Sequence, residues 1–356
     1  MLVPAQLCAQ PKRFFRGIFH RNGFLHGRTT IVTCMRFARA AIIYNPAAGG
    51  GLQHAVERVD EAAAELRRYV SEVRLIPTEP DRRADVLARE AVNAGCDLIA
   101  PCGGDGTINE ALQGLVGSEA FLLPLPAGTA NVFAWETGLP VDPVKAAAKL
   151  PELLACEVEL GTVEFPKEGR SRHFLLMCGA GVDASAVYRL NVDLKKRVGI
   201  IAYFWSASTQ LFRRFEKLRL RVGHETLEST LAVVSKSRVY GGRLVLTPQA
   251  HLLEDAFDVV CFRSASPLVY TGYLAGVLTR TLELFQGVKW RQAREVEMLA
   301  TDSPHVYVQV DGELAGRLPA RVRMGPETAR VLLPKPYCAD YPERIVTTAA
   351  ATVLHG

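Results

Sequence analysis

Three glycines within four residues surround an aspartate in the run Gly103-Gly104-Asp105-Gly106-Thr107. Glycine lets the backbone come close to a ligand, and successive N–H groups at a helix start suit an anion such as phosphate. A carboxylate among them would repel a bare phosphate, but it suits a phosphate that carries Mg2+. The run is therefore predicted to bind a magnesium nucleotide through Asp105, with a plain glycine turn or a helix cap as the alternative.

The residues around this run belong to elements that would present it to a ligand. After Asp97, apolar residues fill 98–102 as in a buried strand, and from 108 to 116 they recur at helical spacing. Ile108 and Asn109 lie in the first turn of that predicted helix. Both are predicted to contact the nucleotide, although Asn109 could instead pair locally.

Two similar turns follow other predicted strands. Asn45 ends the strand predicted at 40–45, where a plain Asn-Pro turn is the alternative, and Gly128 and Thr129 follow the strand predicted at 121–126. The carboxyl ends of parallel strands meet at one edge of a sheet, where ligands bind in α/β proteins. These three residues are accordingly predicted to contact the same nucleotide.

Strand and helix alternate from 39 to 164, which predicts an α/β nucleotide-binding domain with a parallel sheet. Strands are expected at 40–45, 71–76, 97–102 and 121–126, and helices at about 52–69, 81–94, 107–116 and 130–137. Later segments look like strands without regular helical crossovers, so 165–328 is predicted to be a β-rich domain of the sandwich type. The later strands are expected at 157–165, 174–178, 218–222, 230–235, 258–262 and 306–310, and the later helices near 190–215 and 267–285.

Positive charge is concentrated at the start of this 356-residue chain. The net charge is +5, and five Lys or Arg residues precede Met35 in a stretch without Asp or Glu. The remainder is thus neutral, which disfavours a nucleic-acid groove, and no apolar run is long enough to span a membrane. Residues 1–38 are interpreted as a basic extension, either a membrane-surface anchor or a stretch before a true start at Met35. The eight cysteines lack the C-x-x-C spacing of a metal finger. Most lie in apolar surroundings, which indicates reduced core residues and a cytoplasmic protein.

A late predicted strand ends in the acidic turn Asp311-Gly312-Glu313. Together with the earlier loops, and in this order, it resembles the lipid kinases that have a diacylglycerol kinase catalytic domain, among them soluble bacterial diacylglycerol kinases and sphingosine kinases. The resemblance covers about 39–334. It implies an NAD-kinase-like first domain, ATP and Mg2+ as cofactors, a lipid substrate at the membrane surface, and a last segment, 329–356, that packs back on the first domain. It also implies a cytoplasmic protein that is transiently peripheral at the inner membrane face, and it allows a homodimer.

Glu313 is predicted to be catalytic, together with Asp105. Transfer of a phosphoryl group to an alcohol needs a base near the attacking hydroxyl, and a carboxylate at a strand end can face a cleft. A solvated hairpin turn is the alternative, but the resemblance implies the same catalytic role. The resemblance also places Thr78 near the nucleotide and Asp183 near the lipid head group, where a helix N-cap is the alternative for Asp183.

A turn in the second domain resembles the second metal site of the family. The resemblance implies that Mg2+ is held there by the Asp255 side chain and by the backbone carbonyls of Leu252 and Phe257. Glu254 and Ala256 depart from the aspartate and glycine of the family at this turn. If the turn needs positive φ at Ala256, the cost is about 1 kcal/mol or more.

Two further departures concern the metal of the nucleotide. Val132 and Glu159 stand where many bacterial diacylglycerol kinases have aspartates of a water-linked network around Mg2+, so the acceptor need not be diacylglycerol. The leading hypothesis is an ATP- and Mg-dependent lipid kinase that phosphorylates a hydroxyl of a diacylglycerol-like or sphingoid lipid. An NAD-kinase-type enzyme with a soluble substrate and a non-catalytic nucleotide- or lipid-binding regulator are the alternatives.

Overall fold

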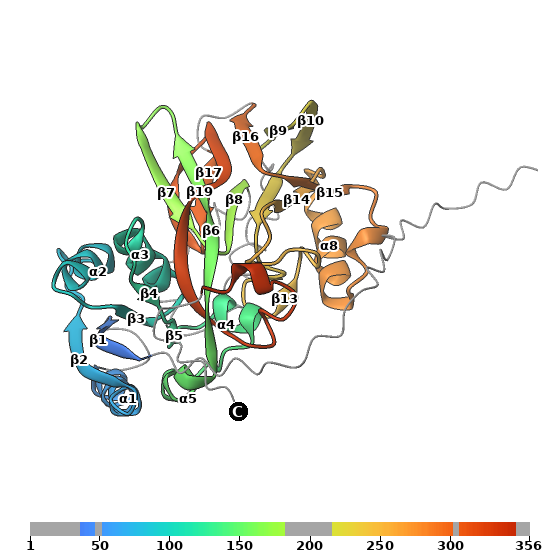
Figure 1. The fold of residues 1–356 in the computed structure, drawn as a ribbon. Coiled ribbons are helices and arrows are strands. Elements are labelled where there is room, and N and C mark those ends of the chain that lie inside the picture. The colour runs from blue at the N-terminus through green and yellow to red at the C-terminus, as the bar shows by residue number, and fades with distance from the viewer. Residues whose placement is uncertain (1–35, 47–51, 182–215, 302–305, 347–356) are drawn as a thin grey trace, which may run out of the picture. The chain divides into compact units, whose positions relative to one another are not determined.

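The computed structural model describes residues 36–46, 52–181, 216–301 and 306–346 (Figure 1). The first elements are β1 Phe37–Tyr44, α1 Leu52–Leu66, β2 Val70–Pro77, α2 Ala84–Asn93, β3 Leu98–Gly103, α3 Asp105–Leu115, β4 Phe121–Leu122, β5 Leu125–Pro126, α4 Val132–Thr137 and α5 Pro143–Ala148. The strands that follow are β6 Leu153–Phe165, β7 Arg170–Phe174, β8 Met177–Gly181, β9 Leu218–Val222, β10 Glu225–Ser229, β11 Leu231–Ser235, β12 Val239–Tyr240, β13 Leu244–Val245 and β14 Phe257–Phe262. The last elements are α8 Pro267–Thr279, β15 Val288–Ala293, β16 Glu295–Ala300, β17 Tyr307–Val310, β18 Glu313–Arg317 and β19 Ala320–Pro334, with short 3-10 turns at Leu150–Glu152, Leu282–Leu284 and Pro342–Arg344. Among the described residues, no helix combines the length and the apolarity that crossing a bilayer requires.

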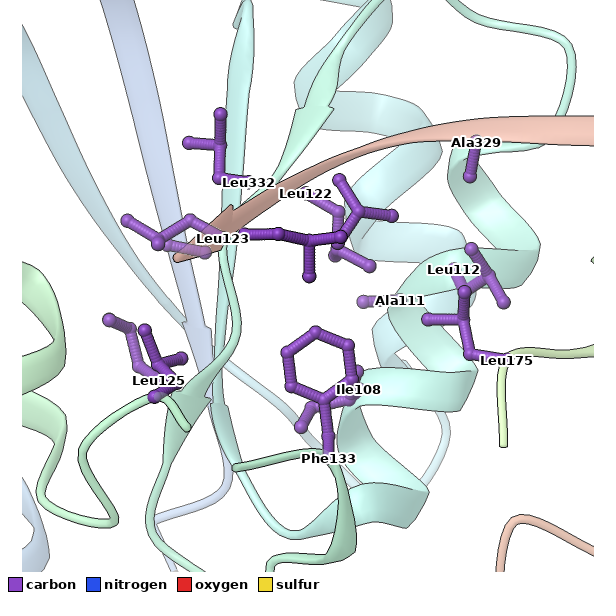
Figure 2. Close-up of a cluster of buried hydrophobic side chains, with 14 of the residues drawn as sticks. Ile108, Ala111, Leu112, Leu122, Leu123, Leu125, Phe133, Leu175, Ala329 and Leu332 are labelled. Atoms are coloured by element: carbon purple, nitrogen blue, oxygen red, sulfur yellow. The ribbon is translucent and has the colours of Figure 1, made fainter. Parts of the chain in front are cut away.

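The N-terminal elements form the predicted α/β layer structure. β1 lies between β2 and β3 and is parallel to both, so that Ile42 is paired with Leu75 on one side and with Ala100 on the other. The apolar face of α3 is buried, and Figure 2 shows Ile108 of this helix beside Phe133 of α4 in the cluster of apolar side chains on the sheet. This packing positions the start of α3 at the carboxyl end of β3.

One long strand extends this sheet into the C-terminal half. In β19, Arg330 and Val331 pair in parallel with Phe121 and Leu122 of β4, while most of the strand runs antiparallel to β6. The resulting sheet has 11 strands in the described chain, with the path β10-β9-β16-β19-β4-β3-β1-β2. The end of β19 therefore lies in the same sheet as the strands that carry the glycine loops.

A second sheet covers the C-terminal half of the first and completes a sandwich. Its order is β15-β14-β11-β8-β17-β18, and all its pairings are antiparallel. The shared core contains buried side chains from both sheets, among them Phe174, Leu220, Val234, Phe257 and Val308. Buried and exposed residues alternate along β9, as expected for a strand that packs against the core with one face and meets solvent with the other. The predicted β-sandwich is confirmed.

The strand predicted at 174–178 is wrong. β7 ends at Phe174 and β8 begins at Met177, so the chain passes from one sheet to the other within the predicted strand. The backbone N–H groups of this crossing donate to the carboxylate of Asp311 instead of to a neighbouring strand. The helix predicted near 190–215 lies outside the described residues.

Substitution of Gly161 tests the packing between β6 and β7. Gly161 is paired with Phe174, and a β-carbon added at Gly161 would lie 2.2 Å from Phe174 Cζ. Gly161→Ala should lower the free energy of unfolding by about 1–3 kcal/mol, measured by urea denaturation, because the ring must leave its rotamer. In the Phe174→Leu background the same change should cost less than about 0.5 kcal/mol, and an equal cost in both backgrounds would contradict this packing.

Candidate active site

Two of the predicted glycine loops meet at the carboxyl edge of the parallel strands. The N–H of Ala127 donates to the carbonyl of Gly103 over 2.8 Å, and a β-carbon added at Gly128 would lie 2.4 Å from the Cα of Gly104. No larger residue could stand at Gly128 without moving the backbone of the other loop. The hydroxyl of Thr107 lies against Gly103, so it belongs to the same turn.

The loops after the outer strands end at the same edge. The N–H of Thr78 donates to the carbonyl of Tyr44 over 2.8 Å, which brings Thr78 next to the strand end that precedes Asn45. Tyr44 is also paired with Cys102 of β3. The structure therefore gathers Asn45, Thr78 and the glycine loops along one edge, although nucleotide binding by them stays a prediction.

The carboxylate of Asp105 caps α4. Its two oxygens accept hydrogen bonds from the N–H groups of Val132 and Phe133, each over 3.0 Å. The helix cap considered from the sequence is thus present, but the capped helix is α4 and not the one that Asp105 begins. Val132 contributes its N–H to this contact, while its side chain is buried in the core.

Asn131 fixes the loop before α4, a role that the sequence reasoning missed. Its backbone has φ of +46°, and its amide group both accepts from the N–H of Gly128 over 2.9 Å and donates to the Gly128 carbonyl over 2.8 Å. Asparagine is among the few residues that tolerate this left-handed conformation. The position of Asn131 between a glycine loop and an apolar helix was the available sequence signal.

Glu313 follows a tight two-residue hairpin. Val310 of β17 is paired with Glu313 of β18, and Asp311 and Gly312 between them have φ of +47° and +84°. Positive φ at both central residues is the type I′ geometry that Asp-Gly favours. The N–H of Gly312 donates to the Gln309 side chain over 2.8 Å, which further fixes the turn.

The hairpin places Glu313 against the start of α3. A β-carbon added at Gly106 would lie 2.6 Å from Glu313 Oε1 and 3.0 Å from its Cδ. Asp105 is the residue before Gly106, so both residues predicted to be catalytic lie at the same turn of α3. The structure thus joins two motifs that are about 200 residues apart in the chain.

The buried carboxylate of Asp311 holds the β17–β18 hairpin in place through hydrogen bonds. Asp311 is only 5% exposed, and its carboxylate accepts from the N–H groups of Leu176 and Met177 over 3.0 and 2.8 Å and from the Asn109 amide over 2.9 Å. Burial raises the pKa of Asp311 to about 6, and these hydrogen bonds oppose the rise because they favour the charged form. The sequence reasoning treated Asp311 only as part of a motif and missed this role.

The side chains of Asn109 and Ile108, both predicted to contact the nucleotide, are engaged within the protein. Besides Asp311, the Asn109 amide donates to the carbonyl of His173 over 2.9 Å, while its oxygen accepts from Arg172 Nε over 2.8 Å. Both amide hydrogens thus have protein acceptors. The side chain of Ile108 is buried in the core, so only its backbone could reach a nucleotide. Asp183, predicted near the lipid head group, lies outside the described residues.

Comparisons with known proteins assign this arrangement to a family. Residues 39–163 match the diacylglycerol kinase catalytic domain, and residues 177–333 match the YegS C-terminal NAD kinase beta sandwich-like domain. A probable lipid kinase YegS-like protein of Pseudomonas aeruginosa (strain UCBPP-PA14) is 31% identical over 297 residues, which are 80% of this chain and 92% of that protein. The chain belongs to the lipid kinases with a diacylglycerol kinase catalytic domain.

Other similar proteins support the same family assignment. A diacylglycerol kinase of Mycobacterium tuberculosis (strain ATCC 25618 / H37Rv) is 29% identical and covers 83% of this chain and 96% of its own. A putative diacylglycerol kinase from Bacillus anthracis has the same fold, with a TM-score of 0.67 at 21% identity over 82% of this chain and 93% of that chain. The family and the kinase activity predicted from the sequence are confirmed.

The side chain of Asp255, predicted to hold a second metal ion, forms an ion pair in this lipid kinase. The Asp255 carboxylate pairs with the guanidinium of Arg294, 3.1 Å from Oδ2 to Nη1, and Arg294 also donates to the Asp255 carbonyl. Leu252 and Phe257 are buried, and Phe257 is paired with Ala293 in the sheet. Among the described residues, no three or more His, Cys, Asp or Glu side chains come together in a group that could hold a metal ion. The ion pair is exposed, with 60% of the Asp255 side chain accessible, so it does not decide whether the carboxylate binds a cation. Metal binding by Leu252, Asp255 and Phe257 stays a prediction, and no step is derived from a second metal.

Replacement of Asp311 should change how stability depends on pH. Its pKa is about 6 when folded and 3.8 as the ordinary value, so the folded lipid kinase takes up a proton between pH 7 and pH 5 that the unfolded chain does not. This uptake adds about 1 kcal/mol to wild-type stability at pH 5, and the gain is lost as the pH rises through 6. Urea unfolding of Asp311→Asn should lack this gain.

Asp258 titrates over the same pH range as Asp311 but does not affect this comparison. Burial also raises the pKa of Asp258 to about 6, but Asp258 titrates in both proteins and cancels in their difference. An equal change of stability between pH 7 and pH 5 in the wild type and in Asp311→Asn would contradict the assignment.

Proposed function

We propose that this lipid kinase transfers the γ-phosphoryl group of magnesium ATP to a hydroxyl of a diacylglycerol-like or sphingoid lipid. The observation that carries the proposal is the contact between Glu313 and Gly106, which puts a carboxylate beside a glycine loop suited to phosphate. Related proteins are named diacylglycerol kinase or probable lipid kinase, which supports the same class of acceptor.

The residues at this edge fit a magnesium nucleotide. The close approach of Gly104 and Gly128 leaves their loops without side chains that would shield the backbone, and α3 directs its N-terminal N–H groups to the same place. Asp105 supplies the carboxylate that the metal of the nucleotide would need. When bound, Mg2+ would neutralise charge that develops on the phosphates.

Glu313 is proposed as the general base. It would accept the proton of the lipid hydroxyl while the new oxygen–phosphorus bond forms and the bond from the γ-phosphorus to the leaving ADP oxygen breaks. Such a base must be held in position, because small displacements of reacting groups are costly. The hydrogen bonds of Asp311 and the tight turn before Glu313 supply that rigidity.

The departures from the family pattern bear on the acceptor. The side chain of Val132 is buried, and Glu159 pairs with Arg294 and Arg344 over 3.1 and 3.2 Å. A carboxylate tied to two guanidinium groups is less suited to a water network around a metal. We therefore propose a hydroxylated lipid acceptor without restricting it to diacylglycerol. Separately, we propose that the protein is cytoplasmic, monomeric or homodimeric, and works at the inner membrane face.

Phosphoryl transfer can be measured directly. The purified protein, γ-labelled ATP, Mg2+ and a bacterial lipid extract in mixed micelles should yield a labelled lipid in the organic phase. Asp105→Ala should abolish the label, and Glu313→Gln should lower kcat by about 100-fold or more while ATP affinity changes little. An unchanged kcat in Glu313→Gln would refute the base assignment. Label in NAD instead of lipid would favour the NAD-kinase type, and ATP binding without transfer would favour a regulator.

A β-carbon at Gly106 tests the position of Glu313 without removing it. Gly106→Ala should displace the flexible end of Glu313 and lower kcat by about 10- to 100-fold, with little change in thermal stability. In the Glu313→Gln background the same substitution should have little further effect on kcat, because the displaced carboxylate is already absent. Additive losses in the double variant would contradict this explanation.

A further inference from the structure

One face of α8 packs firmly on the C-terminal sandwich. The Tyr273 ring lies 5.3 Å from that of Phe262 in β14 and 5.5 Å from that of Phe285, centroid to centroid. The Tyr270 hydroxyl is 2.8 Å from Thr230 Oγ1. Figure 1 shows α8, in orange, beside the strands of this region. Within the part of the chain that the structure describes, these contacts anchor the helix through one of its sides.

The opposite face of α8 is apolar and exposed. Leu268, Thr271, Ala275 and Leu278 are all exposed and recur at intervals of three and four residues, which puts them on one side of the helix. Leu268 is 80% and Leu278 64% exposed, and Leu284 in the next turn is 75% exposed. α8 contains no Asp, Glu, Lys or Arg, whereas the outer face of a surface helix is normally charged.

The hydroxyl groups on and beside this face are satisfied within the helix. Thr271 Oγ1 donates to the Leu268 carbonyl over 2.7 Å, and Thr279 Oγ1 donates to the Ala275 carbonyl over 2.8 Å. A threonine bonded in this way presents its methyl group at little polar cost. The face can therefore leave water without losing hydrogen bonds.

The exposed apolar side chains of the described residues are concentrated here. Eight large ones are exposed, and four of them lie between Leu268 and Leu284, including the three with the greatest exposed fractions. The exposed Arg263 and Arg280 precede and follow the helix, and Glu283 is the one acidic residue from 263 to 284. An apolar face bordered by guanidinium groups is complementary to a layer of acyl chains beneath anionic head groups.

We propose that the outer face of α8, together with Leu284, docks this protein on a bilayer that contains anionic lipids. The proposal rests on the proposed function, since a lipid acceptor must be taken from a membrane. The 13 residues of α8 span only about 20 Å, less than the roughly 30 Å of a hydrocarbon core, so the helix would lie in the interface and not across it.

Vesicle sedimentation without ATP tests the surface separately from catalysis. The wild type should bind vesicles that contain phosphatidylglycerol. The triple variant Leu268→Ser, Leu278→Ser and Leu284→Ser should need about ten-fold or more lipid for half-maximal binding. The double variant Val86→Ser and Val141→Ser is a matched control, because both residues are exposed valines distant in sequence from α8 and should leave binding unchanged.

Charge and catalysis give two further measurements. Arg263→Gln with Arg280→Gln should weaken binding to anionic vesicles several-fold and leave binding to neutral vesicles unchanged. On a short-chain lipid acceptor dissolved as monomers, the triple leucine variant should keep wild-type kcat, whereas on vesicles its rate should fall. Vesicle binding without lipid phosphorylation by the wild type would refute the proposed function while supporting the docking surface.

Two results would overturn the proposal. The first is equal vesicle binding by the wild type and the triple leucine variant, with both shown to be folded by circular dichroism. The second is a wild-type dimer, seen by analytical ultracentrifugation, that the leucine substitutions dissociate while vesicle binding is absent. In that case a second copy of the chain, and not a bilayer, covers α8.

Discussion

The buried carboxylate of Asp311 is the interaction on which the arrangement of the candidate active site depends. A charge removed from water needs strong hydrogen-bond donors, and here they come from the crossing between β7 and β8 and from Asn109 of α3. These segments must therefore come together for the β17–β18 hairpin to be buried at all. Because Glu313 follows after one glycine, the donors that satisfy Asp311 also determine where Glu313 lies.

A second set of contacts ties the glycine loop to the C-terminal half. Asp105 caps the start of α4, and Glu136 near the end of the same helix accepts hydrogen bonds from Ser237, from Arg238 and from the hydroxyl of Tyr337. The side chain of Glu136 is fully buried, so removal of one partner would leave a charge poorly satisfied. α4 is short, but it links the predicted phosphate loop to the sandwich and to Tyr337, which follows β19.

Features that depend on local periodicity could be predicted from the sequence. The strand at 218–222 has the predicted limits, and the glycine run lies at the predicted strand-to-helix junction, because alternation and helical spacing are visible in single segments. The end of β7 could not be predicted, since it depends on an aspartate about 135 residues later in the chain. For the same reason the sequence indicated Glu313 and Asp105 as chemical groups but not the donors that position them. The contact predicted for Ile108 can involve only its backbone, because its side chain is buried, and a sequence motif does not distinguish the two.

The continuity of β19 has a mechanical consequence. Near its start it is paired with β16 and β6, and near its end with β4 of the parallel sheet. Kinases that close around their substrates commonly do so by rotating two bodies about flexible connections. Here such a rotation would strain the backbone hydrogen bonds of β19, whose pairing with β6 is interrupted by a register shift between Met324 and Thr328. Any closure of the two halves must therefore either keep this pairing or break it locally.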